Sequence, residues 1–265
     1  IQVERIDLRF PLNLLVRGVE VIQQPDTLLS LESLNVRVQA WPLLKGKVEV
    51  DEVTLSQVAV NSANLIEGMQ IKGVLGRFFL QSHGVDLSNE TAVVNRTELS
   101  DTHIQLLMTD TTTTPKDTTA SAPVNWKVNL HQLKLKNVSF GMKLPADSMK
   151  MAAYIGEATI DDAKADLKNQ FYGLKQFLLS GASASYDTGE AQPSEGFDAS
   201  HMAVRNIRIG LDSLLYEGRN MNAVIREITM EERSGLSITS LTGRLFSNDS
   251  IIRIPELKLQ TPHSE

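Results

Sequence analysis

A two-residue alternation of apolar and polar side chains runs through most of the chain, and it repeatedly slips by one position. In residues 47–60, KVEVDEVTLSQVAV, the alternation slips at Asp51-Glu52 and again at Ser56-Gln57, and it resumes each time. A period of two is typical of a β-strand with one apolar face and one polar face. The pattern therefore predicts an all-β protein whose strands contain local irregularities.

The slip has the form Φ-x-Φ-x-x-Φ-x-Φ, where Φ is an apolar residue. Further copies of this pattern begin at Leu29, Leu133, Ala158, Phe177 and Ile252. Each x-x pair could be a tight turn, but two-residue hairpin turns favour glycine and positive φ angles, which a pair such as Asp51-Glu52 supplies poorly. A β-bulge is the better interpretation, because one extra residue returns the next apolar side chains to the original face and bends the strand.

Bulged strands with one apolar face predict a curved sheet. Two arrangements are compatible with the pattern. One is the core of a β-sandwich or barrel, in which the apolar face is covered. The other is a long curved antiparallel sheet whose apolar inner face stays open and requires a ligand. At ~4.8 Å per strand, roughly 15 strands would span about 70 Å.

Several segments need separate interpretation. Residues 163–181, AKADLKNQFYGLKQFLLSG, have apolar residues at helical spacing, but Gly173 lies in the middle and a strand-like run follows. We therefore expect strand here. Residues 91–108 are expected to form two strands, and a short helix at residues 62–68 is a weaker alternative.

Two polar segments interrupt the strand pattern. Residues 109–123, TDTTTTPKDTTASAP, have almost no apolar side chains, and residues 187–200, DTGEAQPSEGFDAS, are similar. Such segments bury too little apolar surface to offset the entropy of ordering. We expect both to be flexible loops of a single β-rich segment spanning residues 1–265, because the strand pattern continues across each. A domain boundary near residues 109–123 is the alternative.

Composition excludes several classes of function. The formal net charge is −6 and the cationic residues do not cluster, which argues against nucleic acid as a main partner. The chain has no cysteine, so thiolate metal ligands and cysteine nucleophiles are excluded. No motif such as G-x-S-x-G points to a nucleophile. The histidines lack metal-ligand spacing: His83, His103, His131, His201 and His263. We expect no enzyme, no metal site and no cofactor.

The segment 27–60 contains three elements in a row: an alternating strand from Leu34 to Val38, a Pro42-Leu43-Leu44 element with Gly46, and a Val-x-Val-x-x-Val-x-Leu strand from Val48 to Leu55. With these elements the segment resembles the AsmA-like family, most closely its TamB branch. Residues 230–245, MEERSGLSITSLTGRL, are similar to a pattern in TamB-like proteins of Bacteroidetes-type bacteria. The resemblance implies a β-taco, which is a long antiparallel sheet folded into a half-pipe around an apolar groove.

The resemblance also implies a role in lipid transport. Members of the family are anchored in the inner membrane by an N-terminal helix, extend through the periplasm, and are implicated in moving phospholipid toward the outer membrane. The TamB branch works with an outer-membrane barrel of the TamA/BamA type. Both ends of this chain read as strand, so we expect a periplasmic segment of a longer protein, with the membrane anchor and the barrel-docking region outside it.

A groove of this kind would hold acyl chains against aliphatic side chains. The residues expected to line it are Leu34, Val36, Val38, Val48, Val50, Val53, Leu55, Val58, Val60, Leu133, Leu135, Val138, Phe140, Ile252, Ile254, Leu257 and Leu259. The alternative is a structural scaffold of a translocation and assembly module for outer-membrane proteins, with a sealed core and no lipid. An outer-membrane barrel is less consistent, because aromatic residues are only 5% of the chain and such barrels need aromatic girdles.

Overall fold

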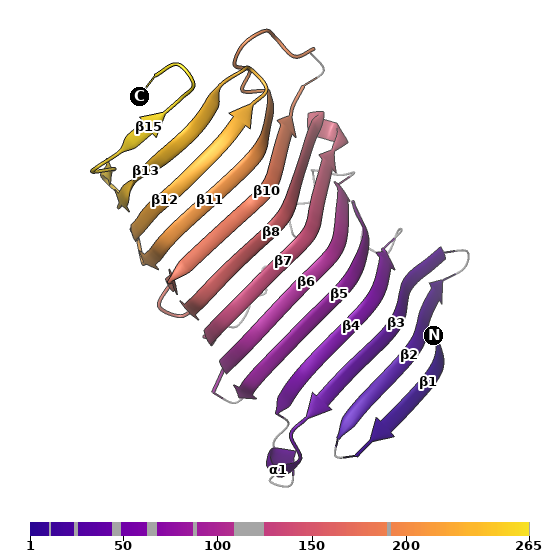
Figure 1. Cartoon of the computed structure of the whole chain (residues 1–265). Coiled ribbons are helices and arrows are strands. Elements are labelled where there is room, and N and C mark those ends of the chain that lie inside the picture. The colour runs from indigo at the N-terminus through magenta and orange to yellow at the C-terminus, as the bar shows by residue number, and fades with distance from the viewer. Residues whose placement is uncertain are drawn as a thin grey trace.

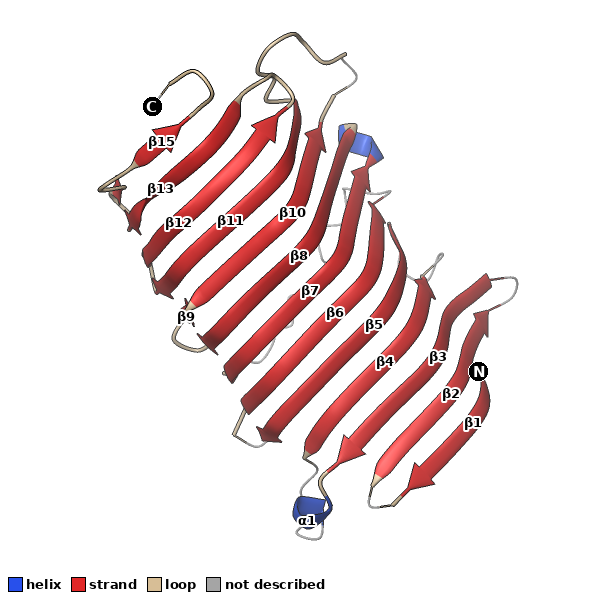
Figure 2. Cartoon of the chain, in the orientation of Figure 1, coloured by secondary structure: helices blue, strands red, loops and turns tan. Residues whose placement is uncertain are grey.

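The computed structural model places the described part of the chain in one long β-sheet (Figure 1). The described residues are 1–10, 12–23, 26–43, 49–62, 68–86, 89–108, 125–189 and 192–264. Figure 2 shows that helix is confined to two short segments among them, α1 (Ala40–Leu43) and the 3-10 turn η1 (Pro145–Asp147). The all-β prediction is confirmed.

The strands follow one another across the sheet in almost the order of the chain. They are β1 (Gln2–Arg9), β2 (Asn13–Gln23), β3 (Asp26–Val38), β4 (Val50–Asn61), β5 (Met69–Asp86), β6 (Thr91–Met108), β7 (Lys127–Leu144), β8 (Met149–Asp166), β9 (Phe171–Leu174), β10 (Gln176–Asp187), β11 (His201–Glu217), β12 (Asn220–Glu232), β13 (Ser237–Ser247), β14 (Ile252–Arg253) and β15 (Lys258–Gln260).

The sheet is shorter than fifteen separate strands would make it. Both β8 and β11 pair with β9 as well as with β10, so β9 continues the line of β10. Likewise β14 and β15 both pair with β13. The path from β1 to β14 therefore has 13 strand positions, and 12 spacings of ~4.8 Å give about 58 Å rather than the expected 70 Å.

The sheet is mixed, so the prediction of a wholly antiparallel sheet is wrong. Strands β6 and β7 are parallel, from Thr91 opposite Lys127 to Leu107 opposite Lys143. A parallel neighbour needs a crossover of a dozen or more residues, and the connection from Met108 to Lys127 is long enough. Alternation alone does not distinguish the two directions. The loop predicted at residues 109–123 lies outside the described residues.

Three local predictions have different outcomes. Residues 91–108 form the single strand β6 instead of two strands, because its irregularity at Asp101 (φ 52) bends the strand without ending it. Residues 163–181 contain no helix, and the strand interpretation is confirmed by β8, β9 and β10. The alternative helix at residues 62–68 falls mostly on residues 63–67, which lie outside the described part of the chain.

Both slips in residues 47–60 are backbone irregularities within β4. Glu52 lies opposite Arg37, but Val50 lies opposite Val38, so Asp51 is an extra residue. Gln57 has a positive φ angle of 49°. The bulge interpretation is therefore confirmed at Asp51. At Gln57 the ladders to β3 and β5 keep their register, so this slip is a kink with a positive φ angle and has no extra residue. The tight-turn alternative is wrong for this strand.

The irregularity at Gln57 belongs to a row that crosses the sheet. Residues with positive φ angles recur at the same level in other strands: Gly18 in β2, Asp101 in β6, Asn137 in β7 and Gly181 in β10. The registers of the intervening strands, including the β8–β10 ladder, align these positions. Figure 1 shows that the long strands bend at a common level. A shared row of irregularities explains why the bend is coherent across the sheet.

Candidate functional site

The strand register places apolar side chains on one face of the sheet. In the β3–β4 ladder the facing pairs are Leu29 and Val60, Leu31 and Val58, Leu34 and Leu55, Val36 and Val53, and Val38 and Val50. The pairs between them, such as Asn35 with Thr54 and Arg37 with Glu52, point to the other face. Directly opposite residues share a face, so β3 and β4 have one apolar face and one polar face.

One line of directly opposite residues shows that this face is continuous. We call it the central row, and every member is apolar: Ile6, Val16, Leu34, Leu55, Phe78, Leu99, Leu135, Ala158, Leu179, Ile209, Ile228, Leu241 and Leu259. The row has one residue at each strand position from β1 to β15. It passes through the parallel β6–β7 pair without interruption.

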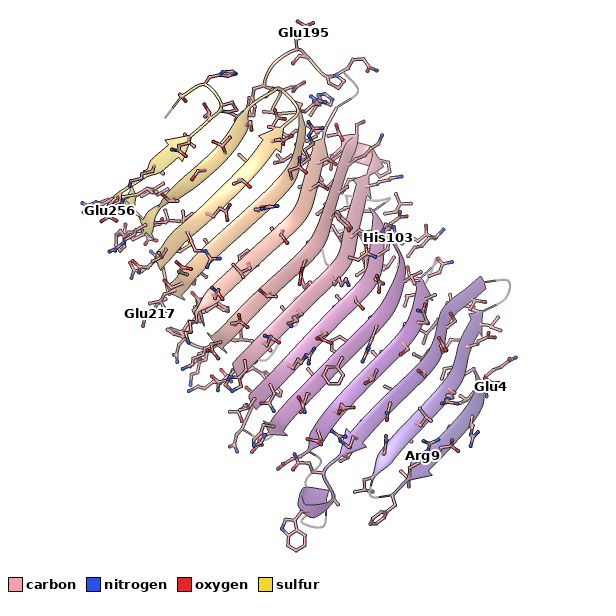
Figure 3. All side chains as sticks on the ribbon, in the orientation of Figure 1. Glu4, Arg9, His103, Glu195, Glu217 and Glu256 are labelled. Carbon is pink, nitrogen blue, oxygen red and sulfur yellow. The ribbon has the colours of Figure 1, made fainter. Side chains whose placement is uncertain are left out.

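The apolar face is not covered by a second layer of the described residues. The buried apolar residues are five, four of them alanine: Ala92, Val94, Ala158, Ala182 and Ala223. The solvent-accessible surface of the chain is 17202 Å², whereas a globular protein of this mass exposes about 11,500 Å². Figure 3 shows the described side chains standing on a single sheet. The apolar face is therefore largely accessible.

The predicted groove residues that are described lie on this face, and none of them is buried. Val60, Phe140 and Ile252 keep 38%, 40% and 72% of their surface exposed. The ladders align the β7 members with the β4 members through β5 and β6. Val48 lies outside the described residues.

The last predicted copy of the slip pattern differs from the others. Residues 252–259 form two short strands, β14 and β15, separated around Pro255 and Glu256, which has a φ angle of 60°. A proline cannot donate a ladder hydrogen bond, so the strand is interrupted here. Ile254 and Leu257 nevertheless lie against Gly243, which is opposite Ile225 on the apolar face.

Sequence reasoning missed many members of the apolar face. Among them are Ile6, Val16, Phe78, Ile209 and Ile228 of the central row. Each lies in a strand-like run, so alternation was a usable signal. Which residues of these runs point to the apolar face depends on where each irregularity falls, and the sequence does not mark that position.

The polar face is connected by hydrogen bonds at the irregular positions of the strands. The Arg37 guanidinium donates from Nε to Asp51 (2.9 Å) and from a terminal nitrogen to Glu52 (2.8 Å), so it bridges the two residues of the first slip. His131 contacts Asp162, whose φ angle is 50° (Nδ1 to Oδ1 3.1 Å). This contact, with a smaller effect of Lys175, lowers the pKa of the Asp162 carboxyl despite its partial desolvation.

The loop between β10 and β11 contains a compact polar cluster. Asp198 accepts hydrogen bonds from the backbone N–H of Ser194 (3.0 Å) and of Ser200 (2.9 Å), and it contacts His201 Nδ1 (3.0 Å). The Ser194 hydrogen bond and then the His201 contact hold the pKa of Asp198 well below its usual range. His201 is buried. This part of the predicted flexible loop of residues 187–200 therefore has specific contacts.

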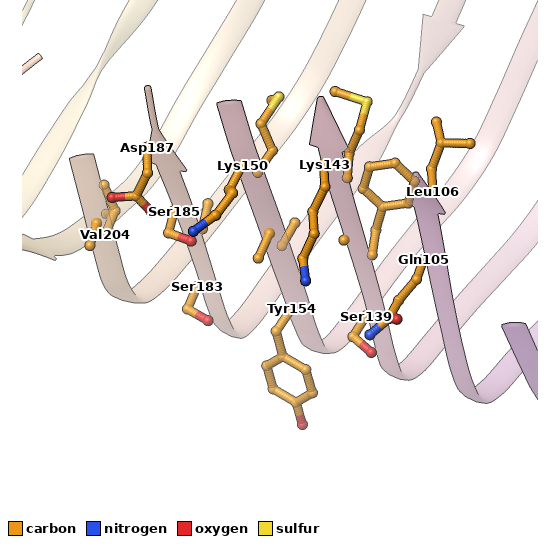
Figure 4. A pocket seen from close by; sticks show the side chains of 18 of the residues that line it. Gln105, Leu106, Ser139, Lys143, Lys150, Tyr154, Ser183, Ser185, Asp187 and Val204 are labelled. Atoms are coloured by element: carbon orange, nitrogen blue, oxygen red, sulfur yellow. The ribbon is translucent and has the colours of Figure 1, made fainter. Parts of the chain in front are cut away.

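A cavity of about 1060 Å³ lies along one edge of the sheet (Figure 4). By edge we mean a side of the sheet at which strands begin and end, and we call this one the methionine edge. It comprises the start of β5 and the end of β6, the end of β7 and the start of β8, and the end of β10 and the start of β11. The cavity lining includes residues of the polar face, such as Lys143, Lys150 and Tyr154, and residues of the apolar face, such as Met142 and Met151.

Metal-binding clusters and membrane-spanning helices are absent from the described residues. They contain no group of three or more His, Asp or Glu side chains arranged to hold a metal ion. None of the described helices has the length and apolar character needed to cross a membrane. In comparisons with known proteins, no family model matches the sequence, and no curated protein matches it.

Proposed function

We propose that the chain is a segment of a bridge-like lipid-transfer protein, in which the sheet is a half-pipe and its apolar face is the inner surface that binds acyl chains. The observation that carries this proposal is the central row, which is apolar from Ile6 to Leu259 without interruption. Figure 4 supports the assignment of the apolar face to the inner side of the bend, since Tyr154 of the polar face points to the outer side.

An uninterrupted apolar row suits transport better than storage. An acyl chain gains ~0.8 kcal/mol per CH₂ on leaving water. A lipid that moves from strand to strand, in steps of ~4.8 Å, keeps this gain only if each step offers equivalent apolar contacts. Aliphatic side chains provide such contacts without hydrogen-bonding groups that would hold a chain at one position.

The accessibility of the apolar face favours lipid binding over a sealed scaffold. A sealed core requires a second layer, and the described residues supply none. Exposed apolar surfaces that extend over many side chains mark binding surfaces in proteins. An acyl chain lying across several strands is an occupant of matching shape and chemistry.

The cellular setting of the proposal follows from the resemblance to the TamB branch. In this setting the segment lies in the periplasm, the lipid is phospholipid, and transfer runs between the inner and outer membranes. In this setting the protein is anchored in the inner membrane and contacts an outer-membrane barrel of the TamA/BamA type.

A substitution on the apolar face tests the proposal. Val53→Asp places a charge on the lining, and Thr54→Asp, one residue later on the polar face, is the matched control. The purified chains are extracted, and bound lipid is quantified by mass spectrometry, with circular dichroism as a check on folding. We expect lipid with the unsubstituted chain and Thr54→Asp, and several-fold less with Val53→Asp. Absence of lipid from the unsubstituted chain, or equal lipid in both variants, would contradict the proposal.

A further inference from the structure

Methionine is concentrated on one edge of the apolar face. Seven of the eight methionines lie in the terminal residues of strands at the methionine edge, on the apolar face: Met69, Met108, Met142, Met149, Met151, Met202 and Met230. The facing pairs Met69 with Met108 and Met142 with Met151 are methionine on both strands. The opposite edge has only Met221. A flexible, polarisable side chain suits a surface that accommodates apolar ligands of varied shape.

The polar face of the same edge has cations without ion pairs. Lys143 lies directly opposite Lys150 in the β7–β8 ladder, and neither forms an ion pair with any residue in the described ranges. Like charges directly opposite each other destabilise a ladder, so an anion between them would relieve repulsion. Asp187 is opposite Lys150 in the next ladder, but it does not approach within ion-pair distance.

The cavity joins these two features. Its lining contains Lys143 and Lys150 together with Met142 and Met151. Lys72, His103, Arg205 and Arg233 add further basic groups, against Asp187 and Glu232. Glu232 already accepts the Ser234 N–H, and Arg205 is paired with Glu231. Figure 4 shows Lys143 and Lys150 on adjacent strands at their ends.

The opposite edge lacks this arrangement. Three of its cations lie in ion pairs, namely Lys127 with Asp166, Lys175 with Asp162 and Arg219 with Asp249. In the described ladders of this edge no two lysines lie directly opposite each other. The two edges of the apolar face therefore differ in charge and in composition, although the central row between them is apolar throughout.

We propose that the methionine edge is the rim at which lipids with an anionic headgroup bind, the headgroup at Lys143 and Lys150 and the acyl chains across Met142 and Met151 onto the apolar face. This inference rests on the proposed lipid-binding function and adds to it the headgroup class and the side of the groove at which the headgroup lies. The charge complementarity and the shared cavity lining identify a lipid, since a free anion would need no apolar rim.

The test compares two fluorescent lipids of the same chain length, phosphatidylglycerol and phosphatidylcholine, binding to the purified chain. We expect phosphatidylglycerol to bind more tightly. Lys143→Glu with Lys150→Glu should reduce phosphatidylglycerol binding roughly tenfold and leave phosphatidylcholine binding unchanged. Lys164→Glu with Lys168→Glu, the same charge change toward the opposite edge, is the matched control and should leave both affinities unchanged.

Each outcome bears on the inference. Equal affinity for the two lipids, or a preference that survives Lys143→Glu with Lys150→Glu, would overturn it while the proposed function stands. Binding of neither lipid would overturn both. Should the charge reversal unfold the chain, Lys143→Gln with Lys150→Gln gives the same comparison with a smaller effect. If glycerol phosphate, which lacks acyl chains, competes as strongly as the whole lipid, the site binds free anions and the lipid assignment fails.

Discussion

At the scale of single residues, the bend depends on side chains that tolerate a left-handed backbone within a strand. Gln57, Asp101 and Asn137 have φ angles of 49°, 52° and 53°. Asparagine and aspartate adopt this conformation at lower cost than most residues, and β-branched residues hardly at all. The Asn137 side-chain amide also donates to Asp101 Oδ1 (2.8 Å) across the parallel pair. The sequence pattern predicts the slips at Gln57 and Asn137 but not the one at Asp101, and it does not show which residue has the positive φ angle.

Asn137 provides a direct test of this backbone requirement. Asn137→Val should lower the free energy of unfolding by about 1–3 kcal/mol, because a β-branched side chain is strained at positive φ. Asn137→Gly should retain most of the stability, since glycine adopts this conformation freely. Urea unfolding measures the free energy of unfolding of both variants. Lys136→Val, a substitution at the preceding exposed position, is the control. Equal losses in Asn137→Val and Asn137→Gly would show that the side-chain hydrogen bond matters and the backbone angle does not.

Asp198 makes stability depend on pH at the acidic end. The Ser194 N–H and then His201 lower its pKa in the folded chain below the ordinary value of 3.8. A depressed carboxyl pKa contributes stability that is present above the unfolded-state pKa and is lost as the pH falls through the folded-state pKa. Asp198→Asn should therefore destabilise the chain at pH 7, and the difference should shrink at pH 3.

Urea unfolding at the two pH values measures this effect, and Glu195→Gln in the same loop is the control. A stability difference between Asp198→Asn and the unsubstituted chain that is the same at pH 7 and pH 3 would rule out the ionised form as its source.

At the scale of elements, alternation predicts strands and their faces but does not predict the direction of a neighbour. Leu133, Leu135, Val138 and Phe140 were assigned to the apolar face from their pattern alone, and the β6–β7 register agrees. That pattern would be the same for an antiparallel β6–β7 pair. The direction depends on the route of the connection after Met108, which the sequence does not specify.

Disulfide cross-linking tests the parallel register, because the chain has no cysteine of its own. Glu98 lies opposite Lys134, so Glu98→Cys with Lys134→Cys should cross-link efficiently on mild oxidation. Glu98→Cys with Lys127→Cys should not, since Lys127 is seven residues from Lys134 and roughly 23 Å away along the strand. Gel mobility with and without reductant distinguishes the two. A cross-link in the second pair without one in the first would require a different register.

At the scale of the whole molecule, the central row joins thirteen strand positions into one apolar surface. Its existence could be predicted from the repeated slips, because each irregularity returns the next apolar side chains to the same face. Which residues belong to the row could not be predicted, because an irregularity displaced by one residue moves every later side chain to the other face. The concentration of methionine at one edge is visible only when the strands are aligned.

Photocrosslinking along and beside the central row measures the central claim most directly. A photoreactive amino acid is placed at Leu55, Leu135 or Ile209 on the apolar face, or at the adjacent polar-face positions Thr54, Lys134 and Arg208. The chain is irradiated with phospholipid, and adducts are counted by mass spectrometry. The lipid-groove account predicts phospholipid adducts at the three apolar positions and few at the three polar ones. Equal adducts on both faces, or none at the apolar positions, would contradict it.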